Sequence, residues 1–268
     1  MRLAVISDIH GNLPALEAVL DDLATRRPDL VMVAGDLVNR GPQPAQVVAR
    51  IRNLAYPAIY GNHERYVLDA AKADDPNAGG ETFAPARWSM RQLDAEQLAY
   101  LRGLPFSLPV ADLLIVHGSP RGDQDGIFRR NSDAEILAKL DGQPRVVCGH
   151  THVSLVRHLD AGLVVNAGSV GNPFEGDTRA RYAWLERRGR GWHAEIVTLA
   201  YDVECALRAF DDSGYVEDAG TMARLFRLEF ATGRNHLIPA YLAHRAAVDA
   251  DEMSLADAAR VYLDGLGE

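Results

Sequence analysis

Five short apolar runs, separated by segments with helical periodicity, dominate the first 165 residues of the chain. Runs of this length with few polar residues are typical of buried strands. We expect strands at residues 3–7, 30–34, 57–60, 113–116 and 145–148. Because strands that alternate with helices form βαβ units, the pattern predicts an α/β fold with a largely parallel sheet.

Three helices between these strands are marked by their sequence. Asn12 is placed to cap the first helix, whose apolar residues recur on one face. That stripe consists of Leu13, Leu16, Val19, Leu20 and Leu23. Apolar residues between Val47 and Leu54 indicate a second helix, and Asp94 with Gln97 forms the capping-box pattern that opens a third.

The pattern changes after residue 153. Strands are predicted at residues 155–158, 163–165, 182–186 and 192–199, with tight turns at 160–162 and 189–191. Such hairpins make this half more antiparallel. From residue 201 the sequence is helical, and the segment from Ser254 to Asp257 is expected to cap the last helix. Residues 74–85, rich in Asp, Pro, Asn and Gly, predict a surface loop.

The composition of the 268-residue chain excludes several classes of protein. Its net charge of −9 disfavours extended nucleic-acid binding, which depends on Lys and Arg. Cys148 and Cys205 cannot form a disulfide framework and suit a reducing cytoplasm. The apolar run at residues 1–6 is too short for a signal peptide, and no window approaches a membrane span. We therefore expect a cytoplasmic protein without a membrane partner, and a homo-oligomer stays open.

Polar residues that commonly bind metals follow all five strands predicted in the first half. They are Asp8, His10, Asp36, Asn62, His63, His117, His150 and His152. Each has a structural explanation on its own: Asn62 can cap a helix, for example, and a single histidine such as His117 can be an ordinary hydrogen-bonded residue. In open α/β sheets, however, functional groups gather beyond the carboxyl ends of the strands. Together the segments predict a metal site.

The donor set indicates which metals fit. Carboxylate, imidazole and amide groups suit first-row divalent ions such as Mn²⁺, Fe²⁺, Co²⁺, Ni²⁺ and Zn²⁺. The number of histidines disfavours Mg²⁺ or Ca²⁺ alone, since these ions prefer oxygen ligands.

The order of the motifs carries a family resemblance. Asp-x-His, Gly-Asp, Gly-Asn-His-Glu, His-Gly and Gly-His-Thr-His follow one another between residues 8 and 152. This series resembles the calcineurin-like metallophosphoesterase superfamily, and residues 166–173 are similar to a segment of its small bacterial and archaeal phosphodiesterase-like members. The resemblance implies a four-layer α/β/β/α sandwich of two mixed sheets flanked by helices. The metallophosphoesterase domain would span residues 1–200. The helical segment at residues 201–268, which matches no family motif, is expected to form a C-terminal extension packed on the same domain.

The same resemblance implies roles for the motif residues. Asp8, His10 and His152 would hold one metal ion, Asp36 would bridge to a second, and Asn62, His117 and His150 would complete the second site. His63 would act as general acid or as a charge stabiliser beside the phosphate. The implied cofactors are two divalent ions, with Mn favoured and Fe, Ni, Co or Zn as alternatives. A hydroxide that bridges the two ions would attack phosphorus.

Three further residues are candidates for substrate binding. Arg40 lies four residues after Asp36, and its segment is similar to one in the protein-phosphatase and diadenosine-tetraphosphatase branches, where an arginine binds phosphate. Arg121 follows the His117 motif. Only two of the 28 basic residues are lysines, so a structural or solvated arginine is an equal explanation for Arg40. Asn12 is either a substrate contact or, as its position favours, only the helix cap.

These observations favour a phosphodiesterase or phosphomonoesterase that acts on a phosphorylated small molecule. A nucleotide hydrolase of the dinucleoside-tetraphosphatase or cyclic-nucleotide type is the alternative, which Arg40 favours. The acidic balance disfavours a nuclease. A non-catalytic scaffold would be expected to lose ligands, and none of the eight motif positions is substituted. Loops at residues 74–90, 121–131 and 172–180 and the C-terminal helices are expected to set the substrate.

Overall fold

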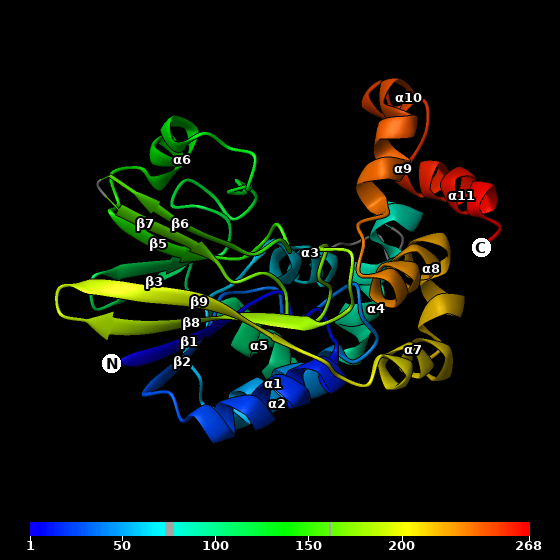
Figure 1. The fold of residues 1–268 in the computed structure, drawn as a ribbon. Helices are drawn as coiled ribbons and strands as arrows, with labels where there is room; N and C mark the ends of the chain where they lie inside the picture. The colour runs from blue at the N-terminus through cyan, green and yellow to red at the C-terminus, as the bar shows by residue number, and fades with distance from the viewer. Residues whose placement is uncertain (73–77, 161) are drawn as a thin grey trace.

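The computed structural model describes residues 1–72, 78–160 and 162–268 (Figure 1). Nine strands are described: β1 (Arg2–Ile6), β2 (Leu30–Val33), β3 (Ser107–Val110), β4 (Leu113–Val116), β5 (Arg145–Cys148), β6 (Leu155–Leu159), β7 (Gly162–Asn166), β8 (Ala180–Arg188) and β9 (Gly191–Leu199). The helices of the first half are α1 (Leu13–Arg26), α2 (Pro44–Leu54), α3 (Asn62–Ala70), the 3₁₀ turn η1 (Glu81–Phe83), α4 (Ala84–Gln92), α5 (Ala95–Gly103) and α6 (Asp133–Leu140). Those of the C-terminal part are α7 (Val203–Asp212), α8 (Tyr215–Thr232), α9 (Leu237–Ala243), α10 (Arg245–Asp249) and α11 (Leu255–Leu266).

The strands form two mixed sheets. In the first sheet the order is β2-β1-β8-β9, with β1 parallel to β2 and antiparallel to β8. In the second the order is β3-β4-β5-β7-β6, with three parallel strands in the centre and an antiparallel strand at each edge. The hairpins β6–β7 and β8–β9 confirm the antiparallel character expected of the second half.

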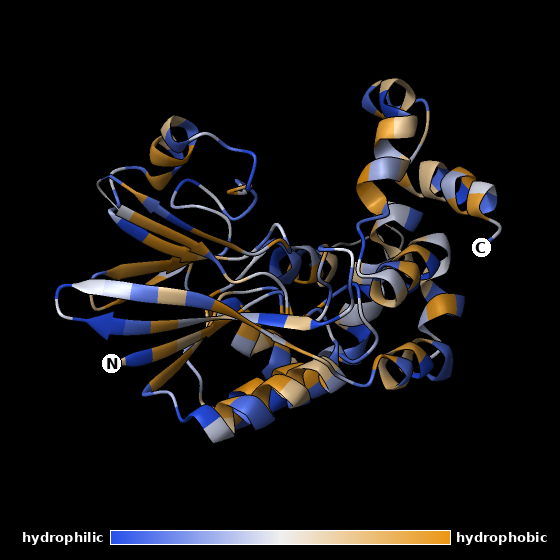
Figure 2. Ribbon diagram, viewed as in Figure 1, coloured by the Kyte–Doolittle hydropathy of each residue, from blue (hydrophilic) through white to orange (hydrophobic). Residues whose placement is uncertain are grey.

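Three apolar layers hold the sheets and helices together. Alternate residues of β1 point to opposite faces of its sheet, so Leu3 and Val5 pack between the two sheets while Ala4 and Ile6 pack against α1 and α2. Ile136 of α6 packs on the outer face of the second sheet. Figure 2 shows apolar residues along the strands of both sheets and along the helices that cover them. The order helix, sheet, sheet, helix confirms the predicted four-layer arrangement.

The helix signals in the sequence are confirmed in the structure. The Asn12 side chain accepts a hydrogen bond from the backbone N–H of Ala15 at 3.1 Å and so caps α1. The side chains of Leu16, Val19, Leu20 and Leu23 are buried, as the apolar stripe predicts. Asp94 and Gln97 form the predicted capping box of α5, and Ser254 caps α11.

The strand predicted at residues 57–60 is wrong. This segment contacts β2 through a single bridge between Val33 and Ala58, with hydrogen bonds from Val33 N–H to Pro57 O and from Ile59 N–H to Val33 O. Pro57 has no N–H to donate, and the N–H of Tyr60 donates to Pro105 O instead of to a strand. The segment is therefore an extended connection that leads into α3.

The loop predicted at residues 74–85 is wrong at its C-terminal end. Residues 81–83 form η1, and α4 begins at Ala84, with Pro85 in its first turn, where proline is favoured. Residues 74–77 lie outside the described residues, as does Ala161 of the turn predicted at 160–162. The sequence analysis did not predict β3, α4 or α6.

The segment from residue 201 onward is helical, as predicted, and shares an apolar core with α4. Trp88 of α4 packs against Tyr215 with ring centroids 4.5 Å apart, and Phe210 and Phe230 belong to the same cluster. Gly220, with φ of 59° and ψ of −137°, interrupts α8. Among the described helices none is both long and apolar enough to cross a bilayer.

Candidate metal centre

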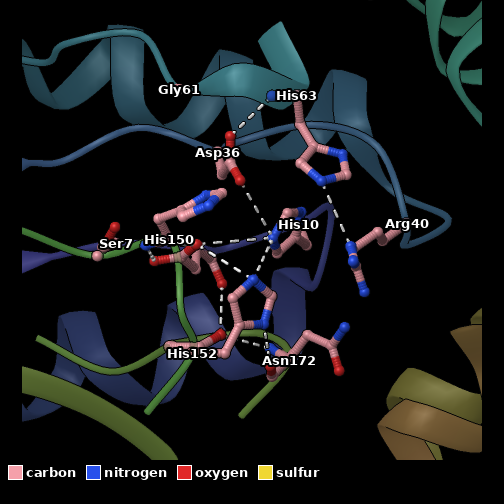
Figure 3. Close-up of polar contacts among 12 residues, drawn as sticks. Ser7, His10, Asp36, Arg40, Gly61, His63, His150, His152 and Asn172 are labelled. Atoms are coloured by element: carbon pink, nitrogen blue, oxygen red, sulfur yellow. Dashed lines mark hydrogen bonds and ion pairs between the residues drawn. The ribbon is translucent and has the colours of Figure 1, made fainter. Parts of the chain in front are cut away.

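The seven predicted metal ligands converge where the loops after β1, β2, β4 and β5 meet the N-terminus of α3. Figure 3 shows His10, Asp36, His150 and His152 pointing toward one another from the loops after β1, β2 and β5. Six of the seven are buried, and His150 is partly buried. The convergence follows from the topology. Strands β1 and β2 are parallel, and so are β4 and β5. The loops after their carboxyl ends therefore lie at one edge of the sandwich.

Unusual backbone conformations set the direction of these ligand side chains. Asp8, His10, Asp36, His150 and His152 all have φ between 50° and 68°, in the left-handed region that non-glycine residues rarely occupy. Such conformations cost energy and cluster at functional sites, where the surrounding structure enforces them. Here they turn the chain sharply at the strand ends and direct the side chains into one space.

Two glycines allow the loops to approach each other. A Cβ atom on Gly61 would lie 2.2 Å from Oδ1 of Asp36, and one on Gly149 would lie 2.3 Å from Oδ2 of Asp8. Any side chain at either position would displace a carboxylate. Steric crowding therefore explains why glycine precedes Asn62 and His150 in the motifs.

The first group of donor atoms comes from Asp8, His10, Asp36 and His152. One ligand atom from each residue lies within 4.8 Å of all the others. Nε2 of His152 lies 3.2 Å from Oδ1 of Asp8 and 3.1 Å from Nε2 of His10. Donors that bind a common ion at 2.0–2.2 Å are themselves about 3 Å apart. This spacing fits a first-row metal ion.

The second group comes from Asp36, Asn62, His117 and His150. Nε2 of His117 lies 3.2 Å from Oδ2 of Asp36 and 3.1 Å from Oδ1 of Asn62. Nδ1 of His150 lies 2.9 Å from the same Asn62 oxygen. Oδ2 of Asp36 also lies 3.5 Å from Nε2 of His10, a donor of the first group. Asp36 is therefore the residue that the two groups share.

The buried oxygen of Asp36 tests whether a cation fits. Oδ1 of this carboxylate accepts the backbone N–H of His63, but Oδ2 is buried and accepts no hydrogen bond from the described residues. A buried carboxylate oxygen without a partner is costly. A divalent cation between the two donor groups would satisfy it, so these residues fit a metal ion.

Backbone carbonyls fix the orientation of three histidine rings. Nδ1 of His10, His117 and His152 lies at hydrogen-bonding distance from the carbonyl oxygens of Val38, Ala34 and Asn172. A carbonyl oxygen can only accept, so each Nδ1 carries the proton and donates it. In the neutral ring Nε2 then faces the site with a free lone pair, which is the arrangement typical of metal-binding histidines.

The electrostatics hold most of the groups in their metal-binding forms. Burial alone would raise the pKa of Asp8 and Asp36, but the neighbouring imidazoles outweigh it and lower both values. Burial lowers the pKa of His10 well below its usual range and that of His150 to about 4. His117 is the exception: burial opposes its charge, but the Asp36 carboxylate raises its pKa to about 10. A cation that binds here has to displace that proton.

His63 lies beside the donor groups. Its ring meets the His10 ring edge-on at 4.7 Å, Asn39 Nδ2 lies 2.9 Å from its Nδ1, and Arg40 donates from Nε to its Nε2 at 3.4 Å. Burial lowers the pKa of His63 to about 3, and the Arg40 charge acts in the same direction.

Arg40, a predicted substrate-binding residue, is held by the C-terminal helices. Its guanidinium donates to the buried Glu229 carboxylate of α8 at 2.6 Å and lies over the Phe226 ring at 4.8 Å. Glu229 also accepts hydrogen bonds from Asn172 Nδ2 and from the backbone N–H groups of His236 and Leu237. The side chain is therefore fixed beside His63.

The structure does not bring the other two predicted substrate contacts to the site. Both polar atoms of the Asn12 side chain are used: Oδ1 caps α1, and Nδ2 donates to Gly171 O and Tyr201 Oη. Arg121 is exposed. Neither residue lines the cavity above the donor groups.

That cavity has a volume of about 420 Å³. It is lined at one end by Asp36, Asn62, His63, His150 and His152. Ligand-binding pockets are typically ~300–1,000 Å³. The cavity is therefore large enough for a small phosphorylated molecule.

For several residues that support the site, nothing in the sequence indicated which residues they contact. Glu64 accepts the backbone N–H of Gly61 at the start of α3 and also those of Asp36 and Leu37, and so holds the β2 loop in place. Asn39 lies in the segment around Arg40 that resembles a family motif, but Glu229 belongs to no recognised motif. In the structure Asn39 has a positive φ of 65°, which asparagine adopts more readily than most residues.

Comparison with known proteins decides the family. A sequence model described as the calcineurin-like phosphoesterase superfamily domain matches residues 1–189. The chain belongs to this superfamily. Its activity class is therefore the hydrolysis of phosphate esters, and its buried Asp-His-Asp-His cluster is a group that can hold a divalent metal ion.

Individual relatives extend the match along most of the chain. A metallophosphoesterase from Sphaerobacter thermophilus is 30% identical, with a TM-score of 0.70 over 87% of this chain and 99% of that one. A hypothetical protein from Pyrococcus horikoshii OT3, 22% identical, has the same fold, with a TM-score of 0.71 over 84% of this chain and 97% of that one. An uncharacterized protein from Methanocaldococcus jannaschii is 28% identical over 223 residues, which are 76% of this chain and 89% of the relative.

Proposed function

We propose that this superfamily member hydrolyses phosphate esters of small molecules with two divalent ions, Mn²⁺ being favoured. The observation that carries the proposal is Oδ2 of Asp36, a buried oxygen that lies between two groups of donors. Asp8, His10 and His152 would hold one ion, and Asn62, His117 and His150 the other, with Asp36 shared. Mn²⁺ suits the mixture of carboxylate, amide and imidazole ligands.

The bound ions would supply an activated water and would polarise the phosphate. The protein's own residues would position the ester. His63 lies on the cavity side of the donor groups, where its ring, once protonated in the presence of the anionic phosphate, would donate a hydrogen bond to the leaving oxygen and give it a proton. Arg40, fixed by Glu229, would donate to a phosphate oxygen. Burial of the donors keeps bulk water from competing for these contacts.

The proposal covers phosphodiesters and phosphomonoesters, because a cavity of about 420 Å³ has room for either. We also propose a cytoplasmic location, which is supported by two cysteines that are free rather than paired.

The test is an assay of the purified, metal-stripped protein after addition of Mn²⁺ or Ni²⁺. The substrates are 4-nitrophenyl phosphate and bis(4-nitrophenyl) phosphate. Hydrolysis of at least one ester, restored by metal and abolished by a chelator, is expected. Absence of hydrolysis of both esters with every metal would contradict the proposal and favour a non-catalytic scaffold.

A further inference from the structure

The cavity above the donor groups extends from the predicted metal ligands to the C-terminal helices. Its lining includes Asp36, His63 and His150 together with Phe226 of α8 and Ile238 of α9. A substrate with its phosphate at the donor groups therefore has the rest of its structure against the C-terminal helices. That end of the cavity is where a preference for one ester over another can arise.

The end away from the donor groups is apolar and rich in aromatic rings. Phe83 of η1 and Met222, Phe226, Ile238 and Leu255 of the C-terminal helices line it. Phe83 and Ile238 are 42% and 52% exposed, although side chains of this kind are usually buried. Exposed apolar side chains that line one cavity are typical of a ligand site.

A series of rings connects the two ends. Tyr66 meets the His63 ring edge-on at 5.3 Å, and Phe83 meets the Tyr66 ring at 5.8 Å. Edge-to-face and stacked arrangements at such distances are favourable between aromatic groups. A planar ring of a ligand could extend this series without a polar contact.

The charges in the cavity limit how many phosphates it accepts. Arg40 is the only Lys or Arg among the described residues that line it. Its charge is already paired with Glu229 at 2.6 Å. A chain of phosphates needs several cationic side chains or backbone donors along its length. The apolar end offers none from lysine or arginine.

We propose that the preferred substrate carries one phosphate group and an apolar, ring-containing alcohol portion, which lies between α9 and η1. This inference rests on the proposed function and specifies the ester for it. In the reaction, water adds its oxygen to phosphorus, the bond between phosphorus and the alcohol oxygen breaks, and that oxygen leaves with a proton. The products are the apolar alcohol and the phosphate.

The first test measures binding rather than turnover. Naphthylphosphonate and methylphosphonate carry the same phosphorus group on a carbon–phosphorus bond that resists hydrolysis, and they differ in the apolar part. Calorimetric titration of the Mn²⁺-loaded protein should give about tenfold tighter binding, about 1.4 kcal/mol, for the naphthyl compound. Equal affinities for the two compounds would overturn the inference.

Two substitutions on one helix locate the apolar contact. Ile238→Ala should remove at least about half of the naphthyl preference and leave methylphosphonate binding unchanged. Leu242→Ala is the matched control, because Leu242 lies on the same α9, is 57% exposed and does not line the cavity. The inference is wrong if both variants, or neither, change the preference.

A third measurement separates this inference from the proposed function. Turnover of naphthyl phosphate should exceed that of ATP and of a dinucleoside tetraphosphate in kcat/KM. Higher kcat/KM for a polyphosphate would overturn the inference and leave the proposed function intact. If neither phosphonate binds the metal-loaded protein and no ester is hydrolysed, the proposed function fails, and the inference fails with it.

Discussion

The backbone and the side chain of one residue can have different roles in this site, and His63 is the clearest example. Its backbone N–H donates to Oδ1 of Asp36 at 2.9 Å, whereas its ring contacts Asn39 and Arg40 on the side of the cavity. The backbone of this residue therefore supports the metal ligands, and its imidazole lines the cavity, where a substrate can displace one of its present partners.

Replacement of His63 by Asn separates these two contributions. His63→Asn keeps the backbone N–H that binds Asp36, so the metal content should stay within the error of the wild-type value. Without the imidazole, kcat should fall by about 10²–10⁴, the range associated with loss of a general acid or base. Metal analysis and steady-state assays of the same preparation measure both quantities.

His158→Asn is the control for this prediction, because His158 is exposed on β6, away from the cavity. It should leave both metal content and kcat unchanged. Wild-type turnover in His63→Asn would remove the ring from the mechanism. Loss of bound metal in that variant would show instead that His63 is part of the metal site.

At this scale the sequence predicted which residue types would meet, because ligands have to be Asp, His or Asn and have to follow strands. It could not predict their supporting partners. Glu64 binds the β2 loop and Glu229 binds Arg40 across sequence separations of 28 and 189 residues. Contacts of this kind depend on how elements pack, and a single sequence carries no period or motif that indicates them. For the same reason Asn12 and Arg121 were proposed from proximity in the chain alone.

Among the elements, α8 connects the C-terminal helices to the site. Its Glu229 is fully buried and forms hydrogen bonds with Arg40, Asn172 and the N-terminus of α9. Farther along the cavity wall, η1 is fixed to the same helix, because Glu81 accepts the N–H of Thr221 next to the break at Gly220. The position of Arg40 thus depends on a helix distant in sequence.

Glu229→Gln should weaken this connection. The amide keeps the size of the side chain but leaves the buried Arg40 guanidinium without a negative partner, which commonly costs about 3 kcal/mol or more. We expect the free energy of unfolding, measured by urea titration, to fall by about that amount. Because Arg40 is then displaced, kcat/KM should fall by about tenfold or more.

Glu217→Gln provides the matched control on α8, since Glu217 is exposed. Its effect on the free energy of unfolding should stay within about 0.5 kcal/mol. If Glu229→Gln changed neither stability nor kcat/KM, Glu229 would not position Arg40.

The secondary-structure elements also show which features the sequence patterns could predict and which they could not. Strands β4 and β5 have the bounds expected from their apolar runs, and α1, α5 and α11 begin at the predicted caps. The segment at residues 57–60 has a strand-like sequence, but its N–H groups are divided between β2 and Pro105. α4 follows residues that are typical of loops. Its packing against α8 determines which of its side chains are buried.

In the whole molecule, the C-terminal helices and the sandwich are joined at several points. Trp88 packs on Tyr215, and Arg260 of α11 forms an ion pair with Glu81 at 3.0 Å. The boundary predicted at residue 200 therefore separates two segments that share a core. We predict that residues 201–268 unfold together with the rest of the chain, since domains joined by a common core behave as one cooperative unit.

Tryptophan fluorescence can test this prediction, because Trp88 lies in the core shared with the C-terminal helices and Trp192 lies between the sheets. Two variants, one retaining only Trp88 and one retaining only Trp192, should each show the same urea midpoint by fluorescence as by circular dichroism. An earlier fluorescence transition confined to Trp88 would show that the extension unfolds separately.

The proposed function depends on the sharing of Asp36 by two metal ions. Its most direct test is the metal content of the protein after reconstitution with Mn²⁺ and removal of excess ion, measured by plasma mass spectrometry. The wild-type chain and the control Asp251→Asn, altered at an exposed residue, should each retain two ions, whereas Asp36→Asn should retain one or fewer. A wild-type chain that retains fewer than two ions, or an Asp36→Asn variant that retains both, would contradict the claim.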